Sequence, residues 1–420
     1  MLDEVKVKLD AQQQYAIDQI HSGKYVFIDG AGGRGKSVIS RQVSDNNTVI
    51  GCPTGAAALN ENGSTLHKLF KLPLNAPTMR DWSKCPKEVK DLFGNGSPVT
   101  RLLIGEIGML RADYFGLINK RLQLARSNPE PFGGIQVVTS GDLLQLSPIV
   151  SGKERYAFNK QYASPYAFSS DAWNFERIEL VKSYRTVDER QVKMLESLRR
   201  GDKWAGRALA MLQSEAKPYA MEEDQLHLCC FRADAWNFNM YRYSQHIGTE
   251  RMYRGVRSKK GDMWTEAPVP VDLQLKIGCK VLIKANCPSG AYVNGDRGVV
   301  AMFGQDFVRV ELERGELVDV TSFTWEKKST SVVDGEIKDK TDSKLEQIPL
   351  ALGYAISIHA AQGCTLDNAA LDVGRGCFAD GQLYTAISRL RDMRNLTFVK
   401  PVGRQDLHTS KDVLRFYGMS

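Results

Sequence analysis

The chain has 420 residues, of which 42% are hydrophobic and 25% are charged, and its formal net charge is +7. This composition is typical of a folded globular protein with roughly two to four domains, and it excludes a disordered or fibrous chain. The positive charge favours a polyanionic partner, although 49 acidic residues also cover the surface.

The distribution of cysteines and apolar residues indicates a compartment. The eight cysteines form no C-x-x-C pair, so we expect reduced thiols and an intracellular protein, and the six scattered histidines indicate no structural zinc. No apolar run approaches the roughly 18 residues of a membrane span, and no signal peptide is recognisable. We therefore expect a protein that is not secreted and that contacts no membrane.

The chain begins with an amphipathic pattern over residues 9–20, in which Ile17 and Ile20 continue the apolar spacing of a helix. Gln13 lies in this helix. Its amide could both donate to and accept from an adenine base, but it could equally be a solvated helix residue.

A glycine-rich stretch follows, and it matches the phosphate-loop pattern G-x-x-x-x-G-K-[ST]. An apolar strand-like run over 25–28 precedes it and a helix-like run over 38–43 follows. Backbone N–H groups of such a turn can surround phosphate oxygens, while Lys36 would reach the β- and γ-phosphates and the Ser37 hydroxyl would bind Mg²⁺. The predicted phosphate site comprises Gly30, Ala31, Gly32, Gly33, Arg34, Gly35, Lys36 and Ser37.

A second predicted strand, 48–52, leads into a segment of small and polar residues. Thr54, Thr65 and His67 are suited to contacts with a phosphate backbone, and Phe70 could stack on a base. The alternative is a tight turn followed by a helix cap, with Phe70 in the core.

Residues 71–98 lose periodicity and contain four prolines. We interpret them as an irregular insertion that carries Trp82 and Phe93. These rings could form a wedge against a duplex or pack onto the parent domain.

The apolar run 101–110 predicts a buried strand that ends in Glu106. A carboxylate at this place can position and deprotonate an attacking water. The residue before it is Gly105, where a carboxylate that holds hydrated Mg²⁺ is expected. We consider Asp29 and Asp142 as partial replacements.

The next strand-like run, 134–139, leads to Asp142 and Gln145. Gln145 could sense a γ-phosphate from the strand end, while Asp142 could hold the loop. The alternation of strands and helices up to about residue 180 predicts a parallel sheet with its sites at the carboxyl ends of the strands.

The second half changes character. A helix is predicted over 191–199 and a strand followed by a helix over 226–239. The basic run 251–260 could follow a phosphate backbone or form a solvated loop. Short β-like runs at 280–284, 298–301 and 307–312 predict a small β-barrel, followed by a polar loop at about 327–346.

The C-terminal part predicts strands at 354–359 and 369–373 and a helix at 381–391. This helix bears Arg389. Its guanidinium could neutralise charge on a γ-phosphate, or it could form a surface ion pair.

Read together, these blocks resemble the PIF and RecD-like helicases of superfamily 1B. The resemblance runs from Leu9 to about Thr397, and it is most specific in segments 131–148, 292–300, 347–367 and 381–391. It implies that Gln13 contacts adenine, that Glu106 is the catalytic base and that Gln145 couples nucleotide state to movement. It further implies that Arg185 and Arg389 come from the second domain to the γ-phosphate, and that a DNA strand runs along Thr54, Thr65, His67, His359 and Thr365.

The resemblance implies an α/β fold with two RecA-like parallel-sheet domains. We expect the first domain at 1–180, with its irregular insertion at about 71–98, and the second at 181–244 and 345–420. An SH3-like β-barrel would be inserted into the second domain at 245–344.

The expected function is that of an ATP-dependent 5′→3′ DNA helicase, with ATP and Mg²⁺ as cofactors, acting in DNA replication, repair or recombination. Single-stranded and forked duplex DNA are the expected partners of a monomer, with accessory replication proteins, in a bacterial or phage-infected cytoplasm or a nucleus. The alternative is a nucleotide-gated single-stranded DNA-binding protein with weak or no hydrolysis, because Gly105 replaces the Asp of the magnesium site. Gly108 in place of a usual Ser, and Ala360 and Ala361 in place of a Lys-Ser pair, are further departures from the family pattern.

Overall fold

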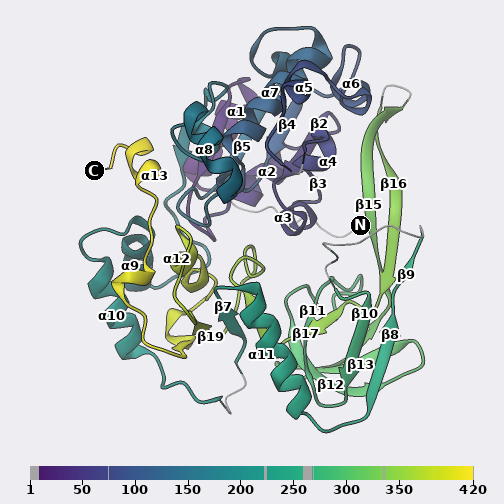
Figure 1. Ribbon diagram of the computed structural model, residues 1–420, viewed down its shortest axis with the longest axis vertical. Helices are drawn as coiled ribbons and strands as arrows, with labels where there is room; N and C mark the ends of the chain where they lie inside the picture. Colours follow the sequence, from purple (N-terminus) through teal and green to yellow (C-terminus); the bar gives the residue numbers. More distant parts are fainter. Residues whose placement is uncertain are drawn as a thin grey trace. The chain divides into compact units, whose positions relative to one another are not determined.

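The structure is a computed structural model that describes residues 9–419 except 74, 222–224, 259–266, 268, 334 and 335. The chain divides into two compact units (Figure 1). The first comprises residues 1–188, 329–340 and 410–420, and the second comprises residues 189–328 and 341–409.

The first unit is built on a parallel sheet in the order β3-β2-β4-β5-β1-β6. Because all pairings are parallel, the carboxyl ends of the strands meet at one edge, where α/β proteins place their ligands. The strands are β1 (Val26–Asp29), β2 (Thr48–Cys52), β3 (Ser64–Thr65), β4 (Arg101–Ile104), β5 (Gln136–Gly141) and β6 (Glu176–Glu179).

Helices cover both faces of this sheet, because successive side chains of β1 point to opposite faces and are apolar on both. Val26 and Ile28 join one apolar cluster with Ile17 of α1 and Ile39 of α2, whereas Phe27 faces a larger cluster on the other side. The helices are α1 (Ala11–His21), α2 (Lys36–Val43), α3 (Gly55–Asn60), α4 (Leu66–Phe70), α7 (Ala112–Arg126) and α8 (Gly152–Gln161), with short 3₁₀ turns η1 (Ile107–Met109), η2 (Pro131–Gly134) and η3 (Ala167–Ser169).

The insertion at 71–98 contains two short helices, α5 (Met79–Ser83) and α6 (Lys87–Phe93). Val89, Leu92 and Phe93 are buried in the larger cluster, and Trp82 packs against it. Trp82 and Phe93 therefore pack onto the parent domain, which is one of the two interpretations that the sequence left open; the other was a wedge against a duplex.

The last helix, α13 (Lys411–Phe416), belongs to the first unit. Val413 is fully buried, and the Phe416 ring stacks on Phe168 with the centroids 4.3 Å apart. The Arg177 guanidinium lies 3.9 Å from the ring centroid of Tyr417. The sequence pattern did not indicate this grouping.

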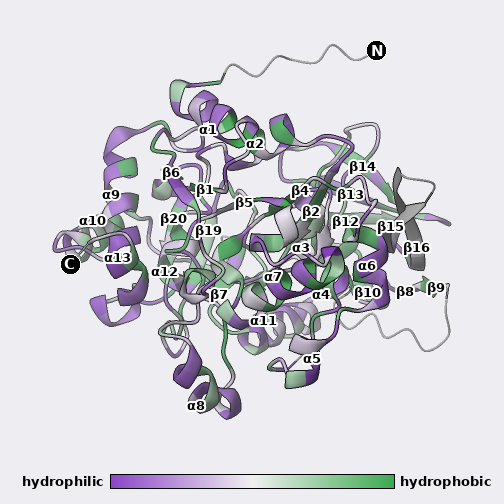
Figure 2. Ribbon diagram, turned by 90° about the horizontal axis from the view of Figure 1, so that it is seen from above, coloured by the Kyte–Doolittle hydropathy of each residue, from purple (hydrophilic) through white to green (hydrophobic). Residues whose placement is uncertain are grey.

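The second unit holds another parallel sheet, in the order β18-β7-β19-β20. Its strands are β7 (His227–Cys229), β18 (Ala355–Ser357), β19 (Ala369–Asp372) and β20 (Leu396–Phe398), and its helices are α9 (Glu189–Arg200), α10 (Ala205–Glu215), α11 (Arg232–Gln245) and α12 (Gln382–Ile387), with turns η5 (Met393–Asn395) and η6 (Arg404–Asp406). In Figure 2, α8 of the first unit and α9 of the second are largely purple (hydrophilic), as expected of helices with one solvated face.

Antiparallel strands form the rest of the second unit. Five of them pair in the order β14-β13-β12-β11-β17, with a register shift between Val300 and Met302 in β12. They are β11 (Lys280–Ile283), β12 (Arg297–Phe303), β13 (Phe307–Leu312), β14 (Leu317–Thr321) and β17 (Leu350–Leu352), while β8 (Glu250–Arg254) pairs with β10 (Asp272–Lys276). The predicted fold class, two parallel sheets with a β-rich insertion, is confirmed.

One expectation for this region is wrong. Apart from residues 334 and 335, which lie outside the described part of the chain, the segment predicted as a polar loop at about 327–346 lies within two long strands. These are β15 (Phe323–Val333) and β16 (Glu336–Gln347), which form a three-stranded sheet with β9 (Val256–Arg257). Leu345 of β16 is fully buried and pairs with Arg257 of β9, so this strand has a buried anchor in spite of its polar composition. Within the predicted basic run, residues 251–254 form β8, and residues 259 and 260 lie outside the described part of the chain.

Candidate nucleotide-binding site

The phosphate-loop motif connects the carboxyl end of β1 to the start of α2. Gly33 and Gly35 have φ values of 79° and 83°, which L-residues with side chains rarely adopt, so the glycines are needed for the shape of the turn. The Lys36 ammonium donates to the carbonyls of Gly30 and Ala31 at 2.7 and 3.1 Å, so the lysine lies across its own loop. Strand, turn and helix thus occur in the order that a phosphate site requires.

Two side chains from outside the motif pack directly onto this turn. A Cβ added to Gly35 would lie 2.3 Å from Nε2 of Gln13, and one added to Gly33 would lie 2.4 Å from Cβ of Arg185. Gln13 is 2% exposed, which excludes the alternative of a solvated helix residue. The structure therefore brings Gln13 and Arg185 to the loop.

Local hydrogen bonds explain these positions. Asp10 and Gln13 cap α1 reciprocally, and the Tyr184 hydroxyl donates to a carboxylate oxygen of Asp10 at 2.7 Å. The backbone N–H of Tyr184 also donates to the Gly33 carbonyl at 2.9 Å. Arg185 belongs to the first compact unit, whereas the resemblance suggested the second domain.

The Arg34 side chain fixes the phosphate loop to the segment that follows β6. Its side chain is 6% exposed, and Nη1 donates to the carbonyl of Leu180 at 2.9 Å. A buried guanidinium that is committed to a backbone carbonyl holds the loop in shape, so a contribution of Arg34 to a phosphate site would come through its backbone.

Glu106 follows β4 at the carboxyl edge of the same sheet. Its φ of 51° is unusual for a residue with a side chain, and such strained conformations concentrate at functional sites. The turn after it packs against the end of β5, because a Cβ on Gly108 would lie only 2.8 Å from the carbonyl oxygen of Asp142. The structure thus explains why Gly is found at position 108.

Gln145 is tied to the same strand end. Its amide Nε2 donates to the Asp142 carboxylate at 3.2 Å, and both residues are buried. Asp142 therefore holds the loop of Gln145, which was one of its expected roles.

Sequence reasoning missed Glu61, which lies beside the phosphate loop. The Ser37 hydroxyl donates to a carboxylate oxygen of Glu61 at 2.6 Å. Burial, together with the charges of Glu61 and Glu106, raises the pKa of the Cys52 thiol to about 12. Two carboxylates therefore approach the end of β2, and no motif in the sequence signals the one from Glu61.

The two aspartates that we considered as replacements for the carboxylate missing at Gly105 have other partners. Asp29 is fully buried, and its carboxylate pairs with Arg177 at 2.7 Å. Asp142 accepts from Gln145 and from the backbone N–H of Leu144, the latter also at 3.2 Å.

The predicted DNA contacts of the first unit divide into two groups. Thr54 and Thr65 accept hydrogen bonds at the starts of α3 and α4, and His67 makes an edge contact with Tyr114. Phe70 is fully buried and stacks on Phe93 with the centroids 5.0 Å apart. It presents no face to a base, because it belongs to the core; this corrects the expected DNA contact.

In the second unit, His359 and Thr365 are half-buried. The His359 ring is nearly parallel to that of Phe378, and burial together with nearby Arg232 lowers the histidine pKa. Arg389 is 2% exposed and donates to the carbonyl of Thr385 at 3.0 Å and to the hydroxyl of Ser388 at 2.8 Å. The alternative of a surface ion pair is therefore excluded for Arg389.

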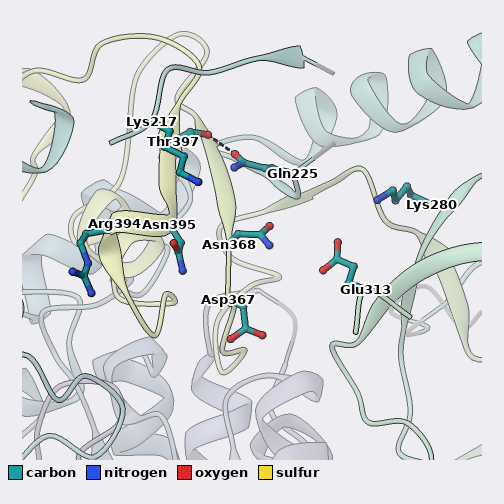
Figure 3. Close-up of a pocket in the computed structure, with 9 residues that line it drawn as sticks. All are labelled: Lys217, Gln225, Lys280, Glu313, Asp367, Asn368, Arg394, Asn395 and Thr397. Atoms are coloured by element: carbon teal, nitrogen blue, oxygen red, sulfur yellow. Dashed lines mark hydrogen bonds between the residues drawn. The ribbon is translucent and has the colours of Figure 1, made fainter. Parts of the chain in front are cut away.

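A polar hollow of about 500 Å³ also lies in the second unit, and it contains none of the predicted site residues (Figure 3). Gln225, Asp367, Asn368 and Asn395 line it just before β7, β19 and β20 begin, so it lies at the amino edge of the sheet. Ligand sites of parallel sheets lie at the opposite edge, and we assign no function to this hollow. Its other lining residues are Lys217, Lys280, Glu313, Arg394 and Thr397.

The described residues contain no group of three or more His, Cys, Asp or Glu side chains that could hold a metal ion. Within the same residues, no helix has the length and apolar character needed to cross a membrane.

The fold and this site define a P-loop nucleotide-binding protein with a second parallel sheet. The family model of the PIF1-like helicases matches residues 8–205 of the chain. The ATP-dependent DNA helicase PIF1 of Danio rerio is 30% identical, with 98% of this chain and 64% of the relative covered. The ATP-dependent DNA helicase Pif1 of Bdellovibrio bacteriovorus is 29% identical, with 98% and 92% covered.

Solved structures agree over the same length. Bacteroides Pif1 in complex with ADP-AlF4 has a TM-score of 0.87 and 27% identity, with 98% of this chain and 96% of that chain covered. Bacteroides Pif1 has also been solved with single-stranded DNA, and another structure concerns two coordinating Pif1 helicases at forked double-stranded DNA. Over nearly its whole length the chain is similar to the PIF1-like helicases. It spans less than two thirds of the length of the zebrafish relative.

Proposed function

We propose that the protein is an ATP-dependent DNA helicase that translocates 5′→3′ on single-stranded DNA and unwinds duplex DNA. The observation that carries this proposal is a phosphate loop with Gln13 and Arg185 packed on it, in a chain that matches Bacteroides Pif1 over 98% of its length. The polarity follows from the family resemblance.

The proposed mechanism assigns one task to each residue of the site. Lys36 and the loop N–H groups bind the β- and γ-phosphates, and Gln13 contacts adenine. Glu106 positions the attacking water and accepts its proton, while Arg185 and Arg389 stabilise the charge that develops on the γ-phosphate. Bound Mg²⁺, held in part by Ser37, supplies charge neutralisation on the phosphates.

Hydrolysis would be coupled to movement through Gln145. If each parallel-sheet unit grips the strand, closure on ATP moves one grip relative to the other, and hydrolysis resets it. We assign the grips to Thr54, Thr65 and His67 in the first unit and to His359 and Thr365 in the second. The Bacteroides relative with bound single-stranded DNA supports a DNA partner.

We further propose that forked duplex DNA is a substrate and that the protein acts as a monomer alongside accessory replication proteins. It would act where DNA is found, in a bacterial or phage-infected cytoplasm or in a nucleus.

An ATPase and strand-separation assay on Lys36→Ala tests the proposal. The wild type should hydrolyse ATP faster with single-stranded DNA and should unwind a duplex with a 5′ tail but not one with a 3′ tail. Lys36→Ala should lower turnover by about 10²–10³-fold, because it removes a charge from the phosphates. The exposed Lys120→Ala on α7 is the matched control and should keep wild-type turnover.

Gly105 favours one second candidate, a nucleotide-gated single-stranded DNA-binding protein with weak or no hydrolysis. Tight, ATP-dependent binding of an oligonucleotide without phosphate release would support this candidate and would contradict the helicase.

A further inference from the structure

The end of β4 lacks the carboxylate that P-loop nucleotidases use to hold Mg²⁺ together with the loop hydroxyl. Gly105 occupies that place. Since Asp29 pairs with Arg177 and Asp142 holds Gln145, the two aspartates nearest in sequence to the site motifs are engaged elsewhere. Since the proposed mechanism uses Glu106 as the base, a carboxylate for the magnesium site would come from a different element.

Glu61 lies where such a carboxylate is needed. It accepts a 2.6 Å hydrogen bond from Ser37, the loop residue whose hydroxyl is the expected metal ligand. A Cβ at position 105 would lie 3.7 Å from Cγ of Glu61 and 3.1 Å from Sγ of Cys52. The glutamate side chain thus approaches the space that a side chain at position 105 would enter.

The backbone around Glu61 is held in place. The N–H of Glu61 donates to the carbonyl of Ala57 at 3.0 Å, and the N–H of Gly63 donates to that of Ala58 at 2.8 Å, which ends α3. Asn62 takes the left-handed conformation with φ of 53°. A Cβ on Gly63 would lie 2.6 Å from the Ile50 carbonyl oxygen, so the turn is held against β2.

We propose that Glu61 supplies the carboxylate of the magnesium site, together with the Ser37 hydroxyl, in place of a side chain at position 105. This inference rests on the proposed nucleotide-binding function. Mg²⁺ prefers oxygen ligands and is held in such sites by one or two carboxylates plus phosphates and water, so the site needs no cluster of three acidic side chains.

The spacing of the two oxygens fits this role. Octahedral Mg²⁺ with ligands at roughly 2.0–2.1 Å holds neighbouring oxygens about 2.9 Å apart. The Ser37 and Glu61 oxygens are already 2.6 Å apart, so both could become ligands after a small separation. Ser37 is exposed and Glu61 is half-buried, so the pair is accessible to a metal–nucleotide complex.

Binding of Mn²⁺ to the full chain with a non-hydrolysable ATP analogue, measured by electron paramagnetic resonance, tests the inference without turnover. Glu61→Gln should weaken Mn²⁺ binding by at least roughly 10–100-fold, because that is the loss when a hydrogen-bond partner of a metal ligand is removed and Glu61 is proposed as a ligand itself. In EDTA, the affinity of the Glu61→Gln protein for the ATP analogue should stay within about twofold of the wild type. This result would show that the phosphate loop is folded. Glu130→Gln, at an exposed glutamate of the same unit, is the matched control and should bind Mn²⁺ like the wild type.

A rescue experiment tests the equivalence of the two positions. Adding Gly105→Asp to a Cys52→Ala, Glu61→Gln protein should restore Mn²⁺ binding, because the alanine removes the sulfur that crowds position 105. No recovery would contradict the inference, as would wild-type Mn²⁺ affinity in Glu61→Gln. If the wild type itself bound no analogue, the proposed nucleotide-binding function would fail instead.

Discussion

At the carboxyl edge of the first sheet, two backbone turns approach so closely that they limit which residue types fit there. The turns after β4 and β5 meet at Gly108 and Asp142, and Glu106 between β4 and this contact is held in a left-handed conformation. Such strain persists only where the surroundings fix it. Gly108 thus allows the close contact between the turns that helps to hold the candidate catalytic base, Glu106, in place.

Gly108→Ala should lower the free energy of unfolding by about 1–3 kcal/mol, because its Cβ would lie 2.8 Å from a backbone oxygen that cannot easily move. Urea denaturation measures the change. Gly152→Ala, at the first residue of α8 where a Cβ meets nothing within 4 Å, should change stability by less than about 1 kcal/mol. Equal stability of the two variants would show that the turns are free to separate.

At the scale of elements, the first unit is completed by a helix from the other end of the sequence. Phe416 of α13 stacks on Phe168 and makes an edge contact with Trp173, and Tyr417 covers Arg177, which in turn pairs with Asp29 at the end of β1. The C-terminal helix thereby supports the strand that leads into the phosphate loop.

Phe416→Ala should destabilise the protein by about 1–3 kcal/mol through lost apolar burial and lost ring stacking. Calorimetry should show a lower midpoint for the transition of the first unit. Lys411→Ala, at an exposed position of the same helix, should leave the midpoint unchanged. A midpoint that does not respond to Phe416→Ala would mean that α13 does not stabilise this unit.

At the scale of the whole molecule, the proposed mechanism assigns residues of both parallel-sheet units to hydrolysis. The phosphate loop, Glu106 and Arg185 belong to the first unit, whereas Arg389 belongs to the second. An arginine supplied by a second unit would make hydrolysis depend on closure.

Arg389→Ala should keep ATP binding within about twofold and should lower DNA-stimulated turnover by roughly 10³-fold or more, as for loss of an arginine finger. Equilibrium binding of a fluorescent ATP analogue and a phosphate-release assay separate the two effects. Because Arg389 is buried, a melting curve is needed to exclude unfolding. An equal loss of binding and turnover would contradict this role.

Local patterns were enough to predict the phosphate loop and the strands β1, β2, β4 and β5 around it, while the family resemblance supplied the fold class with two parallel-sheet domains. The turn at Gly33 and Gly35, and the strand β2 (Thr48–Cys52), depend on neighbours in the sequence, and periodicity and glycine chemistry report on such neighbours directly. The placement of Glu106 at a strand end followed from the same reasoning.

Only the tertiary structure decided which distant residues meet. It placed Phe70 in the core against Phe93, grouped α13 with the first unit, and brought Glu61 to Ser37, which lies 24 residues earlier in the chain. These contacts follow from how helices and turns pack on the sheet, and side-chain packing between segments leaves no periodic signal in one sequence. The sequence therefore determined the class of site, whereas the fold decided which carboxylate lies beside its serine.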